Sequence, residues 1–367
     1  MKPITRILLI SLLATSCSDD ETTSGFAELN GEPFMASSVA AVISGNSLYI
    51  ELVSGSSYLR FWVPRLKNGE SPVNNTRIGS ICEPSLAENT GVFAEYIDES
   101  GNVHFSVSGS LSLSITAGLV SGSFSFYAES MDDSEVTVTK GSFQSPISKP
   151  SGCLLTESGR LNEDDARTVY YAYNQHGNLV GLSRTIGGEL INHYISYVNN
   201  KPVALASRGG WCSKLTLLTY AGDRVAATAN TGEYTFEYNN QLLERYTYFW
   251  DQTTTLVYDE NNNLVGSTLE APFGTTSASF GNYDDHPNPA TLMVQALQQQ
   301  QALLVLLTTN FYFIPNTGST NNPRQSGTVI TVEYEYSRAG YPTKMVFKNS
   351  GGVQIGAPIF FTYTGCR

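Results

Sequence analysis

Apolar and polar residues alternate with a period of two through the first half of the chain, from Phe26 to Phe143. Residues 103–107 place three apolar side chains on one face, and residues 111–115 repeat the pattern. Such alternation is typical of strands that have one face in a core and the other in water. Gly and Asn between the alternating runs permit tight turns. The pattern therefore predicts an antiparallel β-sandwich over residues 26–144.

A series of tyrosines marks the second half of the chain. Each ends an apolar stretch and precedes a turn-forming segment, and the five are Tyr173, Tyr197, Tyr220, Tyr238 and Tyr258. They are separated by 24, 23, 18 and 20 residues, and about twenty residues is the length of one β-hairpin. Because one hairpin cannot bury its own face, we expect the copies to stack side by side. The chain is thus predicted to be mostly β, with a second domain of stacked antiparallel hairpins over residues 153–367.

One segment of the second half departs from the strand pattern. Residues 289–309 carry leucines at helical spacing and begin with Pro289, which suits the first turn of a helix. We expect one helix here, covering the end or the edge of the hairpin stack. Residues 145–152 contain two prolines and are predicted to be the linker between the two domains.

The N-terminus has the features of a bacterial export signal. Lys2 and Arg6 form a positive end, and a short apolar stretch follows. This stretch is far shorter than the ~20 residues that span a bilayer. The segment 13–17 (Leu-Ala-Thr-Ser-Cys) resembles the lipobox of bacterial lipoproteins, which implies a signal peptide over residues 1–16 and a palmitate-type lipid on Cys17. An ordinary signal peptide with an incidental cysteine is the alternative.

The residues after Cys17 extend this resemblance. The segment 18–21 (Ser-Asp-Asp-Glu) is similar to the acidic export tag of surface lipoproteins in Bacteroidota-type bacteria. The resemblance implies that residues 17–25 are a lipidated tether and that the protein is exposed on the outer membrane. An anchor facing the periplasm is the alternative.

Both halves also resemble domains of Bacteroidota lipoproteins. The segments 26–31 (Phe-Ala-Glu-Leu-Asn-Gly) and 137–143 (Thr-Val-Thr-Lys-Gly-Ser-Phe) look like the first and last hairpins of a small lipoprotein β-domain of unknown function. The tyrosine series resembles the tyrosine–aspartate (YD) repeats of Rhs-type wall proteins. With the segments 283–289 (Tyr-Asp-Asp-His-Pro-Asn-Pro) and 340–344 (Gly-Tyr-Pro-Thr-Lys), it looks closer to a YD-repeat-like, Rhs-related lipoprotein domain of unknown function. Neither resemblance implies a catalytic residue.

Net charge and cysteine content limit the possible partners. The formal net charge is −12, and an acidic surface repels the phosphates of nucleic acid, so we expect no nucleic-acid binding. Besides Cys17 the chain has four cysteines, which are Cys82, Cys153, Cys212 and Cys366. Export permits disulfides among them, and three pairings are possible. Because Cys153 begins the second domain and Cys366 ends it, we predict this pair. The cysteines lack the close spacing of a zinc site, and we predict no metal and no cofactor.

Few residues carry recognisable chemistry. Asp284-Asp285-His286 is the most reactive-looking group, because two carboxylates beside an imidazole can bind a metal. The following Pro287 favours the alternative, a turn that enters the helix. The acidic groups at 132–133 and 163–165 are interpreted as solvated loops, and calcium binding there would need distant oxygen ligands.

An aromatic series offers a candidate ligand platform. Tyr246, Tyr248 and Trp250 alternate along one predicted strand, so they share a face. Residues two apart on a strand lie ~6.5–7 Å apart, which suits the stacking of neighbouring sugar rings. Packing within the core is the alternative for the same side chains.

These observations predict a noncatalytic binding, adhesion or structural module of the cell envelope, with a glycan or an envelope protein as its partner. The alternative is an envelope-associated glycan hydrolase, since carboxylates from distant strands can meet in one groove. A carboxylate pair in a groove favours the hydrolase, whereas an aromatic patch without such a pair favours binding.

Overall fold

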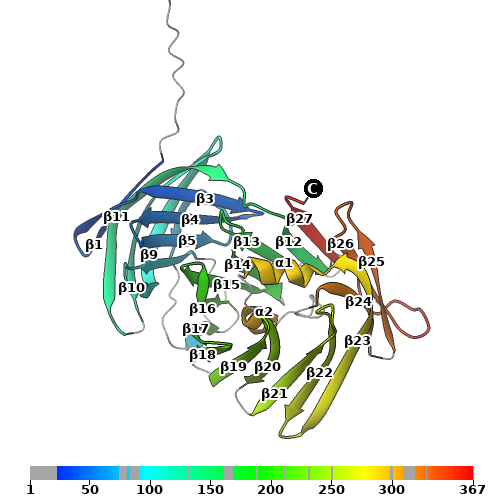
Figure 1. Ribbon diagram of the computed structural model, residues 1–367. Helices are drawn as coiled ribbons and strands as arrows, with labels where there is room; N and C mark the ends of the chain where they lie inside the picture. Colours follow the sequence, from blue (N-terminus) through cyan, green and yellow to red (C-terminus); the bar gives the residue numbers. More distant parts are fainter. Residues whose placement is uncertain are drawn as a thin grey trace, which may run out of the picture.

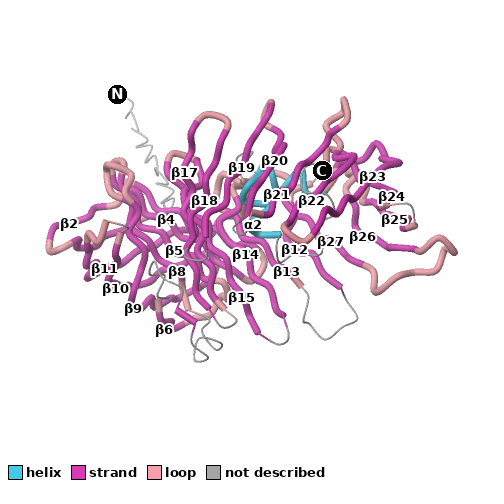
Figure 2. Tube along the Cα trace, turned by 90° about the horizontal axis from the view of Figure 1, so that it is seen from below, coloured by secondary structure: helices cyan, strands magenta, loops and turns pink. Residues whose placement is uncertain are grey.

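Two closed β-barrels follow one another along the chain (Figure 1). The computed structural model describes residues 23–73, 81–82, 91–130, 132–160, 168–186, 189–209, 212–229, 232–248, 251–297, 301–308, 319–327 and 329–366. The small barrel comes first, and the large barrel occupies the rest of the chain. Figure 1 looks into the ring of the large barrel, and Figure 2 shows the two barrels side by side.

Seven of the described strands close the small barrel. In order around the ring they are β10 (Leu119–Glu129), β9 (Val103–Thr116), β8 (Phe93–Ile97), β5 (Ser57–Val63), β4 (Ser47–Ser54), β3 (Ser38–Ser44) and β11 (Glu135–Ser148). The ring closes because β10 pairs with both β9 and β11. Three further strands extend from it, which are β1 (Ser24–Leu29) on β11, β2 (Glu32–Met35) on β1 and β6 (Gly69–Pro72) on β9.

Inward side chains of these strands form one apolar core. The Phe61 ring lies 4.7 Å from Phe124 and 5.7 Å from Phe126, measured between ring centroids. A residue larger than glycine does not fit at Gly141, because a Cβ there would lie 2.3 Å from the Phe124 ring. The predicted sandwich is wrong. A single sheet curls and closes on itself, with β3 and β11 running parallel at the seam.

Sixteen described strands close the large barrel, and each pairs antiparallel with the next along the chain. They are β12 (Leu154–Arg160), β13 (Val169–Tyr173), β14 (Leu179–Ile186), β15 (Glu189–Val198), β16 (Lys201–Arg208), β17 (Cys212–Ala221), β18 (Arg224–Ala229), β19 (Gly232–Asn239), β20 (Leu242–Tyr248), β21 (Gln252–Tyr258), β22 (Leu264–Ala271), β23 (Gly274–Pro287), β24 (Asn321–Ser326), β25 (Ile330–Tyr336), β26 (Pro342–Lys348) and β27 (Ile359–Thr364). The first and last strands also pair, from Leu154 opposite Thr364 to Arg160 opposite Ile359. The predicted row of stacked hairpins is therefore wrong, because the row closes into a ring.

Tyrosine hydroxyls fasten consecutive hairpins of this ring to one another. Each donates to a backbone carbonyl near the start of the preceding strand, and the pairs are Tyr173 to Leu155 (2.5 Å), Tyr197 to Leu179 (2.7 Å), Tyr220 to Pro202 (2.5 Å), Tyr258 to Leu243 (3.0 Å) and Tyr283 to Leu264. We call these five bonds the tyrosine ladder. The ladder gives four of the five recurring tyrosines a structural role, since a phenylalanine in the same place would leave a buried carbonyl without its donor.

Two helices lie inside the large ring, α1 (Pro289–Ala296) and α2 (Gln301–Thr308) (Figures 1 and 2). Asn288 caps α1, because its side chain accepts a hydrogen bond from the Ala290 backbone at 2.8 Å. The hydroxyl of Tyr238, on β19, accepts one from the Ala302 backbone at 2.7 Å. Apolar side chains of both helices belong to the core of the ring. The structure thus divides the single helix predicted over 289–309 into two, and both fill the interior instead of covering an edge.

The outer wall of the large barrel is polar. On β19, Tyr234 and Phe236 are buried inside the ring, whereas Glu233 and Thr235, which alternate with them, are exposed. Ion pairs join neighbouring strands on the outside, namely Arg224 with Glu237 (2.9 Å), Lys344 with Glu335 (2.6 Å) and Lys348 with Glu333 (2.6 Å). The described part of the ring is therefore mainly apolar inside, with the buried Arg184 and His193 as polar exceptions, and polar outside.

Candidate binding site at the junction of the two barrels

A buried charge cluster joins the two barrels. The Nε of Arg60, on β5, lies 2.7 Å from Glu51 Oε2, and its Nη1 lies 3.3 Å from Glu95 Oε1. The same Nη1 donates to the backbone carbonyl of Tyr197, on β15 of the large barrel, at 2.5 Å. All three charged side chains are buried, and burial raises the pKa of Glu95 above its ordinary value. Arg60 therefore compensates two carboxylates and ties them to the other barrel.

Aromatic side chains pack next to this cluster. The indole of Trp62 lies 5.4 Å from the Phe93 ring and 6.3 Å from the Tyr194 ring, between centroids. Gly181 of the large barrel permits the approach, because a Cβ there would lie 2.2 Å from the indole. The Trp62 side chain is fully buried, and its Nε1 has no hydrogen-bond partner among the described residues. An indole N–H donor is thus left without an acceptor at the junction.

A cavity of about 330 Å³ lies between the barrels at this point. Its lining comes from both, with Asn46, Ser47, Trp62, Pro64 and Arg65 from the small barrel and Tyr170, Ser183 and Leu190 from the large one. We call it the Trp62 cavity. Arg65 is exposed, and Tyr170 is 45% exposed. The exposed Tyr170 ring beside hydroxyl, amide and guanidinium groups can stack against a sugar ring and hydrogen-bond its hydroxyls.

A second hollow of about 410 Å³ lies elsewhere along the junction and is mostly apolar. Its lining includes Val103, Phe105, Val203, Ala204, Leu217 and Leu218, together with Ser130 and Asp132. We call it the Phe105 groove. A hydrogen-bond network borders it, in which the Ser134 hydroxyl lies 3.0 Å from His104 Nε2 and 2.7 Å from the Ser130 hydroxyl.

This network lacks the arrangement of a catalytic triad. Ser130 donates to Asp132, and this hydrogen bond, followed by those from Ser134, lowers the pKa of Asp132 to about 2. Asp132 is therefore engaged by two serines. Among the described residues, the buried Nδ1 of His104 has no hydrogen-bond partner, so no carboxylate orients the imidazole as a triad requires.

A third cavity of about 300 Å³ lies at one end of the large barrel. Its lining includes Lys201, Tyr220, Asp223 and Tyr238, and the Lys201 ammonium stands 3.7 Å above the Tyr220 ring. Considering the described residues alone, none of these three cavities is lined by two carboxylates. General acid and base catalysis of glycoside hydrolysis needs such a pair.

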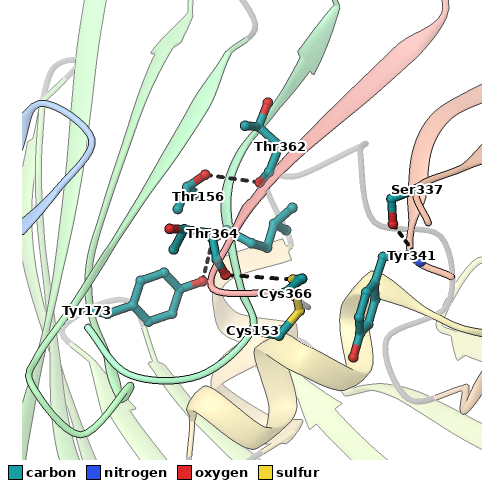
Figure 3. The surroundings of a disulfide bond; sticks show 9 residues. Cys153, Thr156, Tyr173, Ser337, Tyr341, Thr362, Thr364 and Cys366 are labelled. Atoms are coloured by element: carbon teal, nitrogen blue, oxygen red, sulfur yellow. Dashed lines mark hydrogen bonds between the residues drawn. A yellow bond between two sulfur atoms is a disulfide. The ribbon is translucent and has the colours of Figure 1, made fainter. Parts of the chain in front are cut away.

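The structure brings Cys153 and Cys366 together in a disulfide, with their Cα atoms 4.4 Å apart (Figure 3). The bond lies at the seam where β12 and β27 close the large ring. A hydrogen bond from the Thr156 hydroxyl to the Thr362 carbonyl, at 3.1 Å, crosses the same seam.

Two of the three candidate platform residues, Tyr246 and Tyr248 on β20, face the interior of the ring. Tyr246 and Tyr248 are half-buried and pack against the large core. The Tyr248 ring lies 5.5 Å from Tyr234, and the Tyr246 ring lies 6.1 Å from Phe236. Burial raises the pKa of Tyr248 above its ordinary value. These two side chains therefore do not present a flat exposed face, and Trp250 lies outside the described residues.

Asp284 and Asp285 point to different surroundings. The Asp284 side chain is 2% exposed, and it accepts a hydrogen bond from the Asn322 side chain at 3.3 Å and one from the Tyr336 hydroxyl. Asp285 is 96% exposed, and the His286 ring stacks on Tyr336 at 4.1 Å. The structure thus separates the two carboxylates and uses Asp284 to join β23, β24 and β25 before α1.

The remaining sequence-predicted residues lie elsewhere. Cys17 and the acidic group 163–165 fall outside the described residues, whereas Asp132 lines the Phe105 groove. In the part of the chain that the structure describes, no three His, Cys, Asp or Glu residues gather closely enough to hold a metal ion. No helix among the described residues is long and apolar enough to cross a membrane.

Sequence reasoning missed the junction residues Arg60 and Trp62. A signal for them was present in β5, because Leu59, Phe61 and Val63 fill one face while Tyr58, Arg60 and Trp62 fill the other. A strand whose second face carries tyrosine and tryptophan in place of Ser and Thr indicates that this face is covered as well.

Comparison with known proteins adds one structural likeness. No protein-family model matches this sequence, and no curated protein matches it. Among solved structures, it is similar to a porin-like protein from Bacteroides uniformis ATCC 8492, with 12% sequence identity and a TM-score of 0.30. The likeness covers 59% of this chain and 98% of that chain. At this identity and TM-score, it carries no information about what this chain binds.

Proposed function

We propose that this chain is a noncatalytic binding module of the bacterial cell envelope, held on the outer membrane by a lipid on Cys17 and exposed at the cell surface. The polarity of the large ring is the observation that carries this proposal. The described interior of the ring contains mostly apolar side chains and two helices, and its outer wall carries ion pairs. Barrels embedded in membranes have the opposite polarity, with apolar residues outside.

The polarity of the ring has two consequences for function. Both helices and the apolar core occupy the described interior, so we assign the activity to the surface of the molecule. A wall of ion pairs does not suit contact with lipid tails, so the proposed attachment to the membrane depends on the acyl chains of Cys17. The segment 18–21, with its three acidic residues, supports display at the outer surface.

The Trp62 cavity is the proposed ligand site, and a glycan is the proposed ligand. Its lining combines the half-exposed Tyr170 ring with the polar side chains of Asn46, Ser47 and Arg65, and the buried Trp62 forms its inner wall. Binding is favoured over hydrolysis because, within the described residues, none of the three cavities above has a pair of carboxylates in its lining. The walls of the site come from both barrels, so binding requires the junction to stay intact.

We also propose that the second half is related to the YD-repeat-like lipoprotein domains and the first half to the small lipoprotein β-domain. The tyrosine ladder supports the first relation, because it gives the repeated tyrosine a role within each hairpin. Neither relation assigns a catalytic residue, in agreement with a binding role.

A glycan array tests the ligand assignment. The soluble chain, residues 23–367, is expected to bind one class of glycan, and Arg65→Ala and Tyr170→Ala are expected to weaken that binding tenfold or more. Arg245→Ala is the matched control, since Arg245 is an exposed arginine on β20, far along the ring. Absence of binding to any glycan would refute the ligand class. An equal loss of glycan binding in Arg245→Ala would show that the binding site is not the Trp62 cavity.

Fatty-acid labelling of cells tests the anchor. Cys17→Ala is expected to abolish labelling and to release the protein from the membrane fraction. Deleting residues 19–21 is expected to reduce cleavage by protease added to intact cells, with labelling unchanged. Membrane retention of Cys17→Ala equal to that of the native chain would contradict the lipid anchor.

A further inference from the structure

A short strand of the small barrel's chain pairs with the wall of the large barrel. β7 (Ile81–Cys82) follows β6 and precedes β8, both of which belong to the small barrel. It pairs antiparallel with the start of β17, where Ser213 is opposite Ile81 and Cys212 is opposite Cys82. The two remaining cysteines of the mature chain, besides the pair at the ring seam, therefore face each other across one backbone pairing.

This register is compatible with a covalent bond. Residues directly opposite in an antiparallel pair have Cα atoms roughly 4.5–5.5 Å apart. Disulfides bridge Cα atoms roughly 4.4–6.8 Å apart. Since Cys153 and Cys366 are already joined, elimination leaves one pairing of the three that the sequence permits.

We propose that Cys82 and Cys212 form a disulfide that links the two barrels covalently. The bond forms by thiol–disulfide exchange. The two thiols lose two protons and two electrons, and a protein disulfide of the exported compartment is reduced to two thiols. The proposal rests on the proposed export, because cytosolic thiols stay reduced.

The bond would act on the junction that builds the Trp62 cavity. The cavity walls come from two barrels, which the Arg60 cluster and the Trp62 packing hold together without a covalent bond. A disulfide between β7 and β17 closes a loop through the linker and limits how far the two walls can separate. The seam disulfide has no such effect, because both of its cysteines belong to the large barrel.

A cut in the linker distinguishes the two disulfides. A recognition sequence for a site-specific protease is inserted after Lys149, which is exposed between β11 and β12. The full mature chain is purified from exporting cells, alkylated, cleaved and run on a denaturing gel. One linked species without reductant and two fragments with reductant are expected, because Cys82 precedes the cut and Cys212 follows it.

Matched variants make the result specific. Cys82→Ser is expected to separate the fragments without reductant, whereas Cys153→Ser with Cys366→Ser is expected to leave them linked. Peptide mapping of the unaltered protein, without reduction, should recover Cys82 joined to Cys212. Free thiols on these two cysteines, in protein whose Cys153 and Cys366 are oxidised, would refute the proposed Cys82–Cys212 disulfide without contradicting the proposed export. Free thiols on all four would overturn the disulfide and the proposed export together.

Discussion

Replacing Arg60 with methionine tests how the junction holds its buried charge. The change removes the guanidinium from Glu51, from Glu95 and from the Tyr197 carbonyl, while keeping an unbranched side chain of similar length. Glu95 is fully buried, and without Arg60 its pKa should rise further above its ordinary value. The variant then folds with Glu95 protonated.

The expected loss of stability follows from the cost of protonating Glu95. Protonating a carboxyl of ordinary pKa 4.5 at pH 7 costs at most about 3.4 kcal/mol, at about 1.36 kcal/mol per pH unit. Loss of the bonds to Glu51 and to the Tyr197 carbonyl adds to this cost. We expect Arg60→Met to reduce the free energy of unfolding by about 3–5 kcal/mol at pH 7, as is typical when one partner of a buried ion pair is removed.

The pH dependence has a definite sign. In the variant the folded-state pKa of Glu95 lies above the unfolded value, so the folded state binds more protons in the window that begins near pH 4.5 and extends upward. The stability deficit relative to the native chain should therefore shrink as the pH falls from 7 towards 4.5. A second change, Glu95→Gln in the Arg60→Met background, should recover part of the loss at pH 7.

Urea unfolding followed by circular dichroism at pH 7 and pH 5 measures both effects. Arg245→Met is the control, because this arginine is exposed and its loss should change the free energy of unfolding by less than about 0.5 kcal/mol. A deficit below 1 kcal/mol for Arg60→Met, or one of equal size at both pH values, would show that Arg60 does not compensate these carboxylates.

Three further predictions concern packing and titration. Tyr197→Phe should destabilise the chain by about 1–2 kcal/mol in urea unfolding, because the buried Leu179 carbonyl loses its donor; an unchanged midpoint would contradict the ladder. Gly181→Ala should cost about 1–3 kcal/mol and shift tryptophan fluorescence, because the added Cβ meets the Trp62 indole; wild-type emission would mean that the barrels move apart freely. Burial lowers the pKa of His193 from 6.5 to about 3, so its stabilising contribution is complete above pH 6.5 and is lost as the pH falls towards 3; His193→Gln should flatten that slope in an acid titration.

The alternation of apolar and polar residues predicts where the strands lie, but it does not predict whether their sheet closes into a barrel. A sandwich strand and a barrel strand both have one inward face, so the same pattern fits either fold. What distinguishes them here is pairing between distant residues, such as Leu154 with Thr364, and local periodicity carries no record of it. The interior position of the helices had a signal, because residues 302–307 are apolar on every side, which is typical of a buried helix.

The candidate site was less accessible to sequence reasoning. Alternation placed Tyr246 and Tyr248 on one face of a strand, and the structure has them so, but which face is buried depends on the curvature of the ring. The Trp62 cavity depends on residues more than a hundred positions apart, such as Trp62 and Tyr170, that meet only because two barrels dock. Such a site has no local spacing that a sequence pattern can reveal.

Because the tyrosine ladder fastens five of the hairpins to the strand before them, the ring is built of repeated units, and its size is set by their number. One more hairpin would raise the strand count from sixteen to eighteen and the circumference in proportion. The cross-section would then grow by about a quarter, since area follows the square of circumference. The two interior helices fill the present cross-section, so a longer relative would need a larger insert between the strands that correspond to β23 and β24. The number of hairpins and the length of the insert should therefore change together among such rings. A protein that gained a hairpin without a longer insert would have a hollow ring.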